Sequence, residues 1–276
     1  MTTIRMLHTF DEVSAIGELL AGIWDAPPEQ PPIDLSMVLA IAHSDGYVVG
    51  AYQDGASQHG ELVGASVGFV GGRDRDELHS HITGVRKDRT SAGIGFAIKQ
   101  HQRSWALERG LTAITWTFDP LIARNAYFNL TRLGGRIAEY LINFYGPMDD
   151  GLNLGQPSDR AFVRWDLAAA QTLPPPGPVG PARVILDRAP DGSPIWHGEL
   201  IAHEPVELII PDDIETMRRL DPALALRWRL ALRDAMTTLL DQAWTITGFR
   251  RGGGFLVTPP TRTKIITQED RDERRP

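Results

Sequence analysis

The chain has 276 residues, and its 42% hydrophobic and 23% charged residues are typical of a globular protein with a substantial core. A formal net charge of −7 argues against a general nucleic-acid binder, which usually carries a basic face. Cysteine is absent, which excludes disulfides, thiolate nucleophiles and cysteine-ligated zinc, and the sequence shows neither a signal peptide nor an apolar run of the ~20 residues in a membrane span. We therefore expect a soluble, cytoplasmic protein that binds neither nucleic acid nor a membrane.

Residues 1–169 contain patterns that predict a domain of strands and helices. Apolar residues with helical spacing indicate helices, and β-branched or aromatic runs bounded by Gly, Pro or Asp indicate strands. The predicted strands are 4–7, 47–53, 61–70, 78–85, 111–118, 136–145 and 161–167. The predicted helices are 10–24, 34–43, 93–109 and 124–133, and the loop 146–160 is long enough to be functional.

A proline-rich segment marks the clearest boundary in the chain. Residues 171–181 (QTLPPPGPVGP) hold five prolines and two glycines, which suit a semi-rigid linker, so we predict a linker over 170–181. The residue patterns after the linker predict a smaller α+β domain over 182–260 and a charged, disordered tail over 261–276. Its predicted strands are 182–186, 195–197, 206–210, 244–249 and 255–258, with one long helix over 213–244. Apolar residues spread around more than one face of that helix, which either a second domain or a homodimer interface would explain.

A glycine-containing turn lies between the strand 78–85 and the helix that follows it. Here successive backbone N–H groups can point toward one place, and the helix dipole favours an anion there. Glycine at 93 and 95 removes the side chains that would hold a phosphate away. The turn therefore predicts a phosphate-binding site.

The order of these elements, with the turn, resembles the GNAT superfamily of N-acyltransferases, whose signature is a strand ending in Val, an R/Q-x-x-G-x-G/A turn and a helix. The matching residues here are Thr83, Gly84 and Val85, then Thr90, Ser91, Ala92, Gly93, Ile94, Gly95 and Phe96. The resemblance covers residues 4–167, and the chain also looks like a subgroup with a C-terminal extension. It implies an α/β (α+β) fold with a central mixed, mostly antiparallel sheet flanked by helices, plus the smaller C-terminal domain.

The resemblance also implies a reaction with acetyl-CoA or another acyl-CoA as co-substrate and no metal. In the family the amides of the turn hold the pyrophosphate, and the strand ending in Val pairs with the pantetheine arm. The thioester then lies where this strand and the next one separate, and the primary amine of a small molecule attacks it directly. Such chemistry needs positioning, donors for the oxyanion and a base.

Two residues depart from the family pattern. Thr90 stands where the family has Arg or Gln, and Leu130 stands where many members have a Tyr that protonates the leaving thiolate. Tyr127, one turn earlier on a similar face, is the candidate substitute. The departures motivate an alternative function, a catalytically impaired acyl-CoA sensor or interaction module.

Candidate bases lie at the ends of the two central strands. Asp119 follows the strand 111–118, where it could act as a base, bind the amine or simply form a turn with Pro120. Side chains alternate between the two faces of a strand, so His79 and His81 lie on the same face. A neutral imidazole can act as a base. Both histidines could instead have only structural roles, and a metal site is disfavoured because no third ligand lies near them. The base is Asp119 or His81, acting directly or through water.

Further candidates start the helix 124–133 and end the loop 146–160. Asn125 could contact the pantetheine or cap the helix. Arg124 and Arg160 could bind a substrate carboxylate, as in an amino acid, and Arg160 could instead form a loop ion pair. One decoy is excluded: Ser66 lies in a G-x-S-x-G pattern, but no helix follows its strand as a hydrolase elbow requires.

Overall fold

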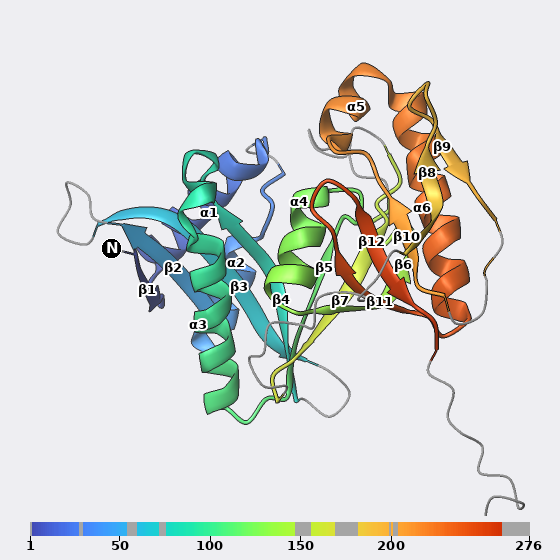
Figure 1. The fold of residues 1–276 in the computed structure, drawn as a ribbon. Coiled ribbons are helices and arrows are strands. Elements are labelled where there is room, and N and C mark those ends of the chain that lie inside the picture. The colour runs from blue at the N-terminus through green and yellow to red at the C-terminus, as the bar shows by residue number, and fades with distance from the viewer. Residues whose placement is uncertain are drawn as a thin grey trace, which may run out of the picture.

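The computed structural model describes residues 2–27, 30–53, 60–71, 76–146, 156–168, 182–198, 200 and 204–260, which form two β-sheets with helices packed on them (Figure 1). The predicted linker 170–181, the predicted tail 261–276 and most of the predicted loop 146–160 lie outside the described residues.

The first sheet has seven strands in the order β1-β2-β3-β4-β5-β7-β6. Every neighbouring pair is antiparallel except β4 and β5, which are parallel. This confirms the predicted mixed, mostly antiparallel sheet. The strands are β1 (Thr2–Met6), β2 (Tyr47–Gln53), β3 (Glu61–Gly71), β4 (Glu77–Val85), β5 (Ala113–Phe118), β6 (Arg136–Leu141) and β7 (Arg160–Asp166).

Helices cover both faces of this sheet (Figure 1). Strand side chains alternate between faces, so Val48 packs with α1 and α2 while Val49 packs with α3. Thr9 and Glu12 form a capping box at the start of α1, and Asp34 caps α2. The helices are α1 (Phe10–Trp24), α2 (Leu35–His43), η1 (Lys87–Ala92), α3 (Ile94–Glu108), α4 (Ala123–Ala126) and the π-helix η2 (Tyr127–Arg132).

One strand and one helix of the first part of the chain differ most from the prediction. The strand predicted over 136–145 ends at Leu141, where Asn143 adopts a left-handed backbone conformation (φ 49°) and the chain turns. The helix predicted over 124–133 widens into a π-helix, in which the N–H of Leu133 bonds to the carbonyl of Phe128 at 3.0 Å.

The second sheet has five strands in the order β11-β12-β10-β8-β9. The single helix predicted over 213–244 is two helices, α5 (Ile214–Leu220) and α6 (Pro222–Asp241). Proline excludes helical geometry at the residue before it, so Asp221 ends α5 and caps α6 through the N–H of Leu224. The strands are β8 (Arg183–Arg188), β9 (Pro194–Trp196), β10 (Val206–Ile209), β11 (Thr245–Phe249) and β12 (Gly254–Thr258).

The two sheets share one apolar core. Helix α6 contacts β6 of the first sheet as well as β8 and β9 of the second, which accounts for its apolar residues on more than one face. Strand β11 contacts η2, where the hydroxyl of Thr131 donates to the carbonyl of Phe249 at 2.7 Å. The C-terminal elements are therefore anchored beside α4 and η2.

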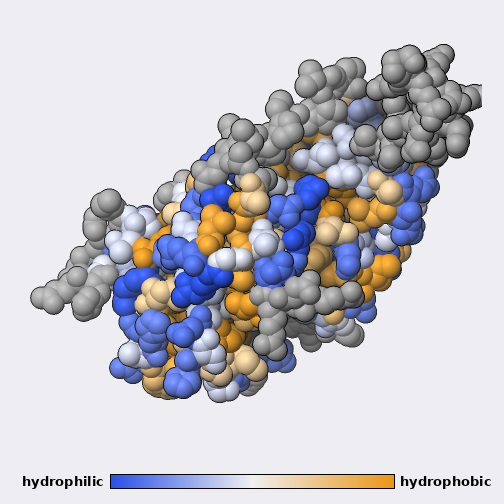
Figure 2. Space-filling model, turned by 90° about the horizontal axis from the view of Figure 1, so that it is seen from below, coloured by the Kyte–Doolittle hydropathy of each residue, from blue (hydrophilic) through white to orange (hydrophobic). Residues whose placement is uncertain are grey.

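The surface carries both apolar and hydrophilic side chains. Seen from below, they are interspersed (Figure 2). Within the described ranges, every helix is too short or too polar to cross a bilayer.

Candidate active site

Strands β4 and β5 separate after a short paired segment. They pair only from Glu77 to His79 on β4, opposite Ala113 to Thr115 on β5. Beyond this segment β4 stays paired with β3 as far as Val85, and β5 stays paired with β7 as far as Phe118. The facing edges of β4 and β5 therefore open into a gap toward their carboxyl ends, where an extended ligand could pair with the backbone of β4.

A β-bulge lies at the start of the gap. Val67 of β3 faces Ile82 and Gly68 faces Ser80, so His81 is an extra residue in β4. The rings of His79 and His81 lie 6.5 Å apart, so the two histidines share a face as predicted. His81 is exposed, whereas His79 is half-buried and stacks on Phe162.

Both histidines are suited to accept a proton. Partial loss of solvent lowers the pKa of His79 and, although its side chain reaches the surface, that of His81. Repulsion from a protonated His81 and from Lys99 lowers the pKa of His79 further. Each imidazole is therefore neutral near pH 7, which is the form that acts as a base.

The predicted phosphate turn follows β4. Residues 87–92 form η1, Gly93 adopts the left-handed conformation (φ 75°), and α3 begins at Ile94. No side chain caps the first N–H groups of α3, so the backbone presents them to a ligand. A Cβ atom at Gly95 would lie 3.9 Å from both Phe128 and Val85, which shows how close these groups come to the turn.

Two arginines that flank the turn are held by carboxylates. Arg86 forms ion pairs with Glu61 and Asp88, and Arg89 lies 3.5 Å from Asp88 and 3.8 Å from Glu61. A third, Arg132 of η2, has its guanidinium 5.5 Å from the ring centroid of Phe96 at the start of α3. Of Thr90, Ser91 and Ala92 the structure describes the backbone, which belongs to η1.

Asn125 lies on α4 and Tyr127 on η2, the π-helix whose Phe128 comes close to Gly95. Asn125 is half-buried in the first turn of α4, which no side chain caps. Tyr127 is half-buried, and the guanidinium of Arg251 lies 4.6 Å from its ring centroid. Leu130 is fully buried in the core.

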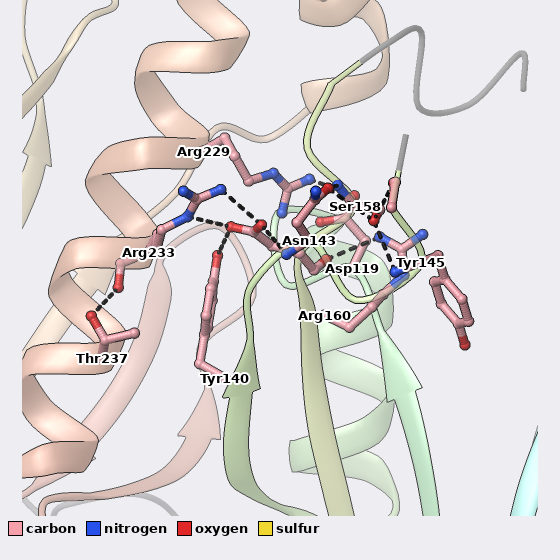
Figure 3. A network of polar contacts seen from close by, with 11 residues as sticks. Asp119, Tyr140, Asn143, Tyr145, Ser158, Arg160, Arg229, Arg233 and Thr237 are labelled. Atoms are coloured by element: carbon pink, nitrogen blue, oxygen red, sulfur yellow. Dashed lines mark hydrogen bonds and ion pairs between the residues drawn. The ribbon is translucent and has the colours of Figure 1, made fainter. Parts of the chain in front are cut away.

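Asp119 is bound by two arginines of the C-terminal part, of which Figure 3 labels Arg229. Its Oδ2 accepts hydrogen bonds from Arg218 at 2.5 Å and Arg229 at 2.8 Å, and its Oδ1 accepts one from the N–H of Leu121. Burial alone would raise the pKa of Asp119, but Arg229 and Arg218 outweigh it and hold this pKa far below its usual range. A carboxylate held in this way is a weak base, so the geometry favours His81 for that role.

The two predicted substrate arginines have different surroundings. Arg124 is exposed and forms an ion pair with Glu215 of α5. Arg160 is buried, donates to the carbonyl of Asp159 at 2.9 Å, and lies 5.2 Å from the ring centroid of Tyr145. The structure therefore brings Arg160 near Asp119 and leaves Arg124 at the contact with α5.

A network next to Arg160 also joins the two parts of the chain. Asp159 accepts two hydrogen bonds of 2.9 Å from Arg233 of α6 and one from the hydroxyl of Tyr140 (Figure 3). The N–H of Asn143 completes the shell of this carboxylate.

The sequence analysis missed Lys99, which is buried at the start of the gap. Its Nζ donates to Ser80 at 2.8 Å and to Gln102 at 3.1 Å, and lies 4.2 Å from the ring centroid of Trp116. Burial lowers the pKa of Lys99 to about 7. The sequence does contain evidence for this burial, because helical spacing places Lys99 and Gln102 on the same face of the helix as the apolar Ala106.

Two further points concern the hydrolase pattern around Ser66 and a possible metal site. Ser66 lies inside β3, buried, with its Oγ 2.8 Å from the Oγ1 of Thr83, so it is not on a hydrolase elbow. Across the described residues, no cluster of three His, Asp or Glu side chains has the arrangement of a metal site.

No protein-family model matches the sequence, and no curated protein matches it. Similar solved structures include the ribosomal-protein-S18-alanine N-acetyltransferase of Escherichia coli (18% identity, TM-score 0.47), which aligns over 62% of this chain and 97% of its own. A Salmonella typhimurium protein solved with its cofactor acetyl-CoA (15%, 0.48) aligns over 60% and 94%. A Desulfovibrio desulfuricans protein described as of the GNAT family (16%, 0.49) aligns over 61% and 100%.

Proposed function

We propose that the protein is an acyl-CoA-dependent N-acyltransferase, which transfers an acetyl or other short acyl group to a primary amine of a small molecule. The observation that carries the proposal is the gap between β4 and β5, which opens beside the uncapped start of α3. A ligand with an extended amide chain and a pyrophosphate at one end matches both features.

Coenzyme A would occupy the gap and the turn together. The N–H groups of Gly93 to Phe96 would bind the pyrophosphate, and the edge of β4 from Thr83 to Val85 would pair with the pantetheine arm. Asn125, in the first turn of α4, would contact the same arm. The thioester would then lie near the bulge at His81.

The chemistry there is direct attack of the amine on the thioester carbonyl. A C–N bond forms, the oxyanion accepts hydrogen bonds from the β4 backbone, and the C–S bond then breaks. His81 takes the proton that the amine loses, through water where the two are not in contact. Asp119 fixes the end of β5 through its arginines and takes no part in proton transfer.

The acceptor that we favour carries a carboxylate, as an amino acid does. Arg160 supports this choice, since its guanidinium lies beside the aromatic ring of Tyr145 near the end of β5. Arg124 already donates to Glu215, so it would bind such a carboxylate only with its guanidinium shared between the two acids. A homodimer and a cytoplasmic location remain predictions.

Calorimetry with coenzyme A, followed by a panel of amines with acetyl-CoA and succinyl-CoA, tests the proposal. We expect binding and turnover of at least one amine. Binding without turnover across the panel would favour the acyl-CoA sensor. The observation that supports this alternative is the position of the Arg251 guanidinium over the ring of Tyr127, the candidate proton donor. Absence of binding would contradict both functions.

A further inference from the structure

Lys99 lies at the point where β4 and β5 separate. Its Nζ contacts Ser80 and Trp116, which are the first residues of the two strands beyond the paired segment. The side chain is only 4% exposed. An ammonium group is therefore buried at the closed end of the gap in which the proposed function places the thioester.

The surroundings of Lys99 contain no compensating anion among the described residues. Its neighbours are the hydroxyl of Ser80 on β4, the ring of Trp116 on β5 and the amide of Gln102 on α3. His79, on the other face of β4, is the titratable group whose pKa responds to the charge of Lys99. Burying a lysine without a carboxylate partner destabilises a fold, so a role in function would account for this one.

Cleavage of a thioester creates a need for a proton at this place. The sulfur leaves with the electron pair of the C–S bond and must be protonated or stabilised as a thiolate. Tyr127, the donor that the sequence suggested, has its ring beneath the guanidinium of Arg251.

We propose that the Lys99 ammonium donates a proton to the leaving sulfur of coenzyme A, an inference that rests on the proposed function. The neutral amine forms the C–N bond and loses one proton to His81. The C–S bond breaks, and the sulfur takes one proton from Nζ to become the thiol. Imidazolium and neutral lysine then return to their starting forms by exchange with water.

The acidity of Lys99 fits this step. Burial lowers its pKa to about 7, below the value of about 8.5 that is usual for a thiol, so transfer to the thiolate is downhill. A lysine in water, at 10.5, would be too weak an acid. The face of the Trp116 ring stabilises the ammonium before transfer.

Nuclear magnetic resonance can test the contact between Nζ and sulfur without an acceptor. The chain has three lysines, Lys87, Lys99 and Lys264, so a protein with ¹³C at the lysine ε position gives three signals, and Lys99→Met identifies one. The Lys99 signal is titrated with pH in the free protein, with coenzyme A, and with desulfo-coenzyme A, which lacks the sulfur.

We expect the Lys99 signal to show a second step above about pH 8 with coenzyme A but not with desulfo-coenzyme A, because Nζ senses the ionisation of the thiol where the two groups are in contact. A single step with both ligands bound would overturn the role of Lys99 and leave the proposed function standing. Failure of both ligands to bind would overturn both proposals.

Kinetics of Lys99→Met give the second measurement. We expect kcat to fall about 100-fold with an unchanged KM for acetyl-CoA. We also expect wild-type activity to decline above pH 7 as Lys99 loses its proton, and this decline to be absent from the variant. Arg103→Met is the matched control, because Arg103 is a cation on the same helix that donates to the carbonyl of Leu167, away from the gap. Wild-type kcat in Lys99→Met would overturn the inference.

Discussion

The Nη2 of Arg229 donates a 2.8 Å hydrogen bond to the Oδ2 of Asp119, although the two residues are 110 positions apart in the chain. Arg218 binds the same oxygen. Helices α5 and α6 therefore hold the end of β5, the strand that forms one side of the gap. The C-terminal part of the chain is thus a structural component of the candidate site.

Replacement of Asp119 by Asn should destabilise the protein strongly. The substitution removes the carboxylate charge to which two buried arginines donate, a change that typically lowers the free energy of unfolding by about 3–5 kcal/mol. Urea denaturation measures it. Asp212→Asn, at an exposed pair with Arg188, should cost less than about 1 kcal/mol, and similar losses in the two variants would contradict the role of Asp119.

Lys99 should make stability depend on pH. Its pKa is about 7 in the folded protein and 10.5 ordinarily, so between these values the unfolded chain binds more protons than the folded one. The free energy of unfolding therefore increases as the pH rises from about 7 to 10.5. Below pH 7 the buried lysine is charged, and it then destabilises the folded protein by the full amount.

Lys99→Met removes that contribution. We expect the unfolding free energy of the variant, relative to the wild type, to decrease between pH 6 and pH 9. Urea denaturation at the two pH values measures the difference, with Arg103→Met as a control that should follow the wild type. Parallel curves for Lys99→Met would show that Lys99 does not titrate in this range.

His81→Ala should lower kcat about 100-fold or more, because it removes the base. Burial lowers the pKa of His81 below 6.5, so wild-type kcat/KM should rise as pH increases through that region, and this limb should be lost in the variant. His43→Ala, an exposed histidine on α2, is the control. Full activity in His81→Ala would assign the base elsewhere.

Gly95→Val should weaken binding of coenzyme A at least tenfold. Its side chain would occupy the space between Phe128 and Val85, next to the proposed pyrophosphate site. Gly93→Val should do the same and also strain the backbone, since Gly93 is left-handed. Calorimetry compares both with Gly22→Val, since a Cβ atom added at Gly22 on α1 meets no other atom within 4 Å. Unchanged affinity in Gly95→Val would refute this placement.

Local patterns were sufficient to predict most elements of the first sheet. The predicted helix 10–24 and strand 47–53 match α1 and β2 residue for residue, because helically spaced apolar residues mark the one and a β-rich run marks the other. The end of α5 at Asp221 is predictable from the sequence, because the residue before a proline disfavours helical geometry. The π-helix was not available, since its wider turn depends on packing against β11.

The candidate site was predictable only in part. The turn at Gly93 and the shared face of His79 and His81 follow from local spacing. The pairing of Asp119 does not, because its partners come from helices about a hundred residues later in the chain. Lys99 looks like a solvated charge in the sequence, and only the separation of β4 from β5 places it in the interior.

A crystal structure with coenzyme A bound tests the central claim most directly. We predict the pyrophosphate on the N–H groups from Gly93 to Phe96, the pantetheine arm paired with β4 from Thr83 to Val85, and the sulfur in the gap beside Lys99. Coenzyme A bound away from the gap, or not bound when present in excess, would contradict the account.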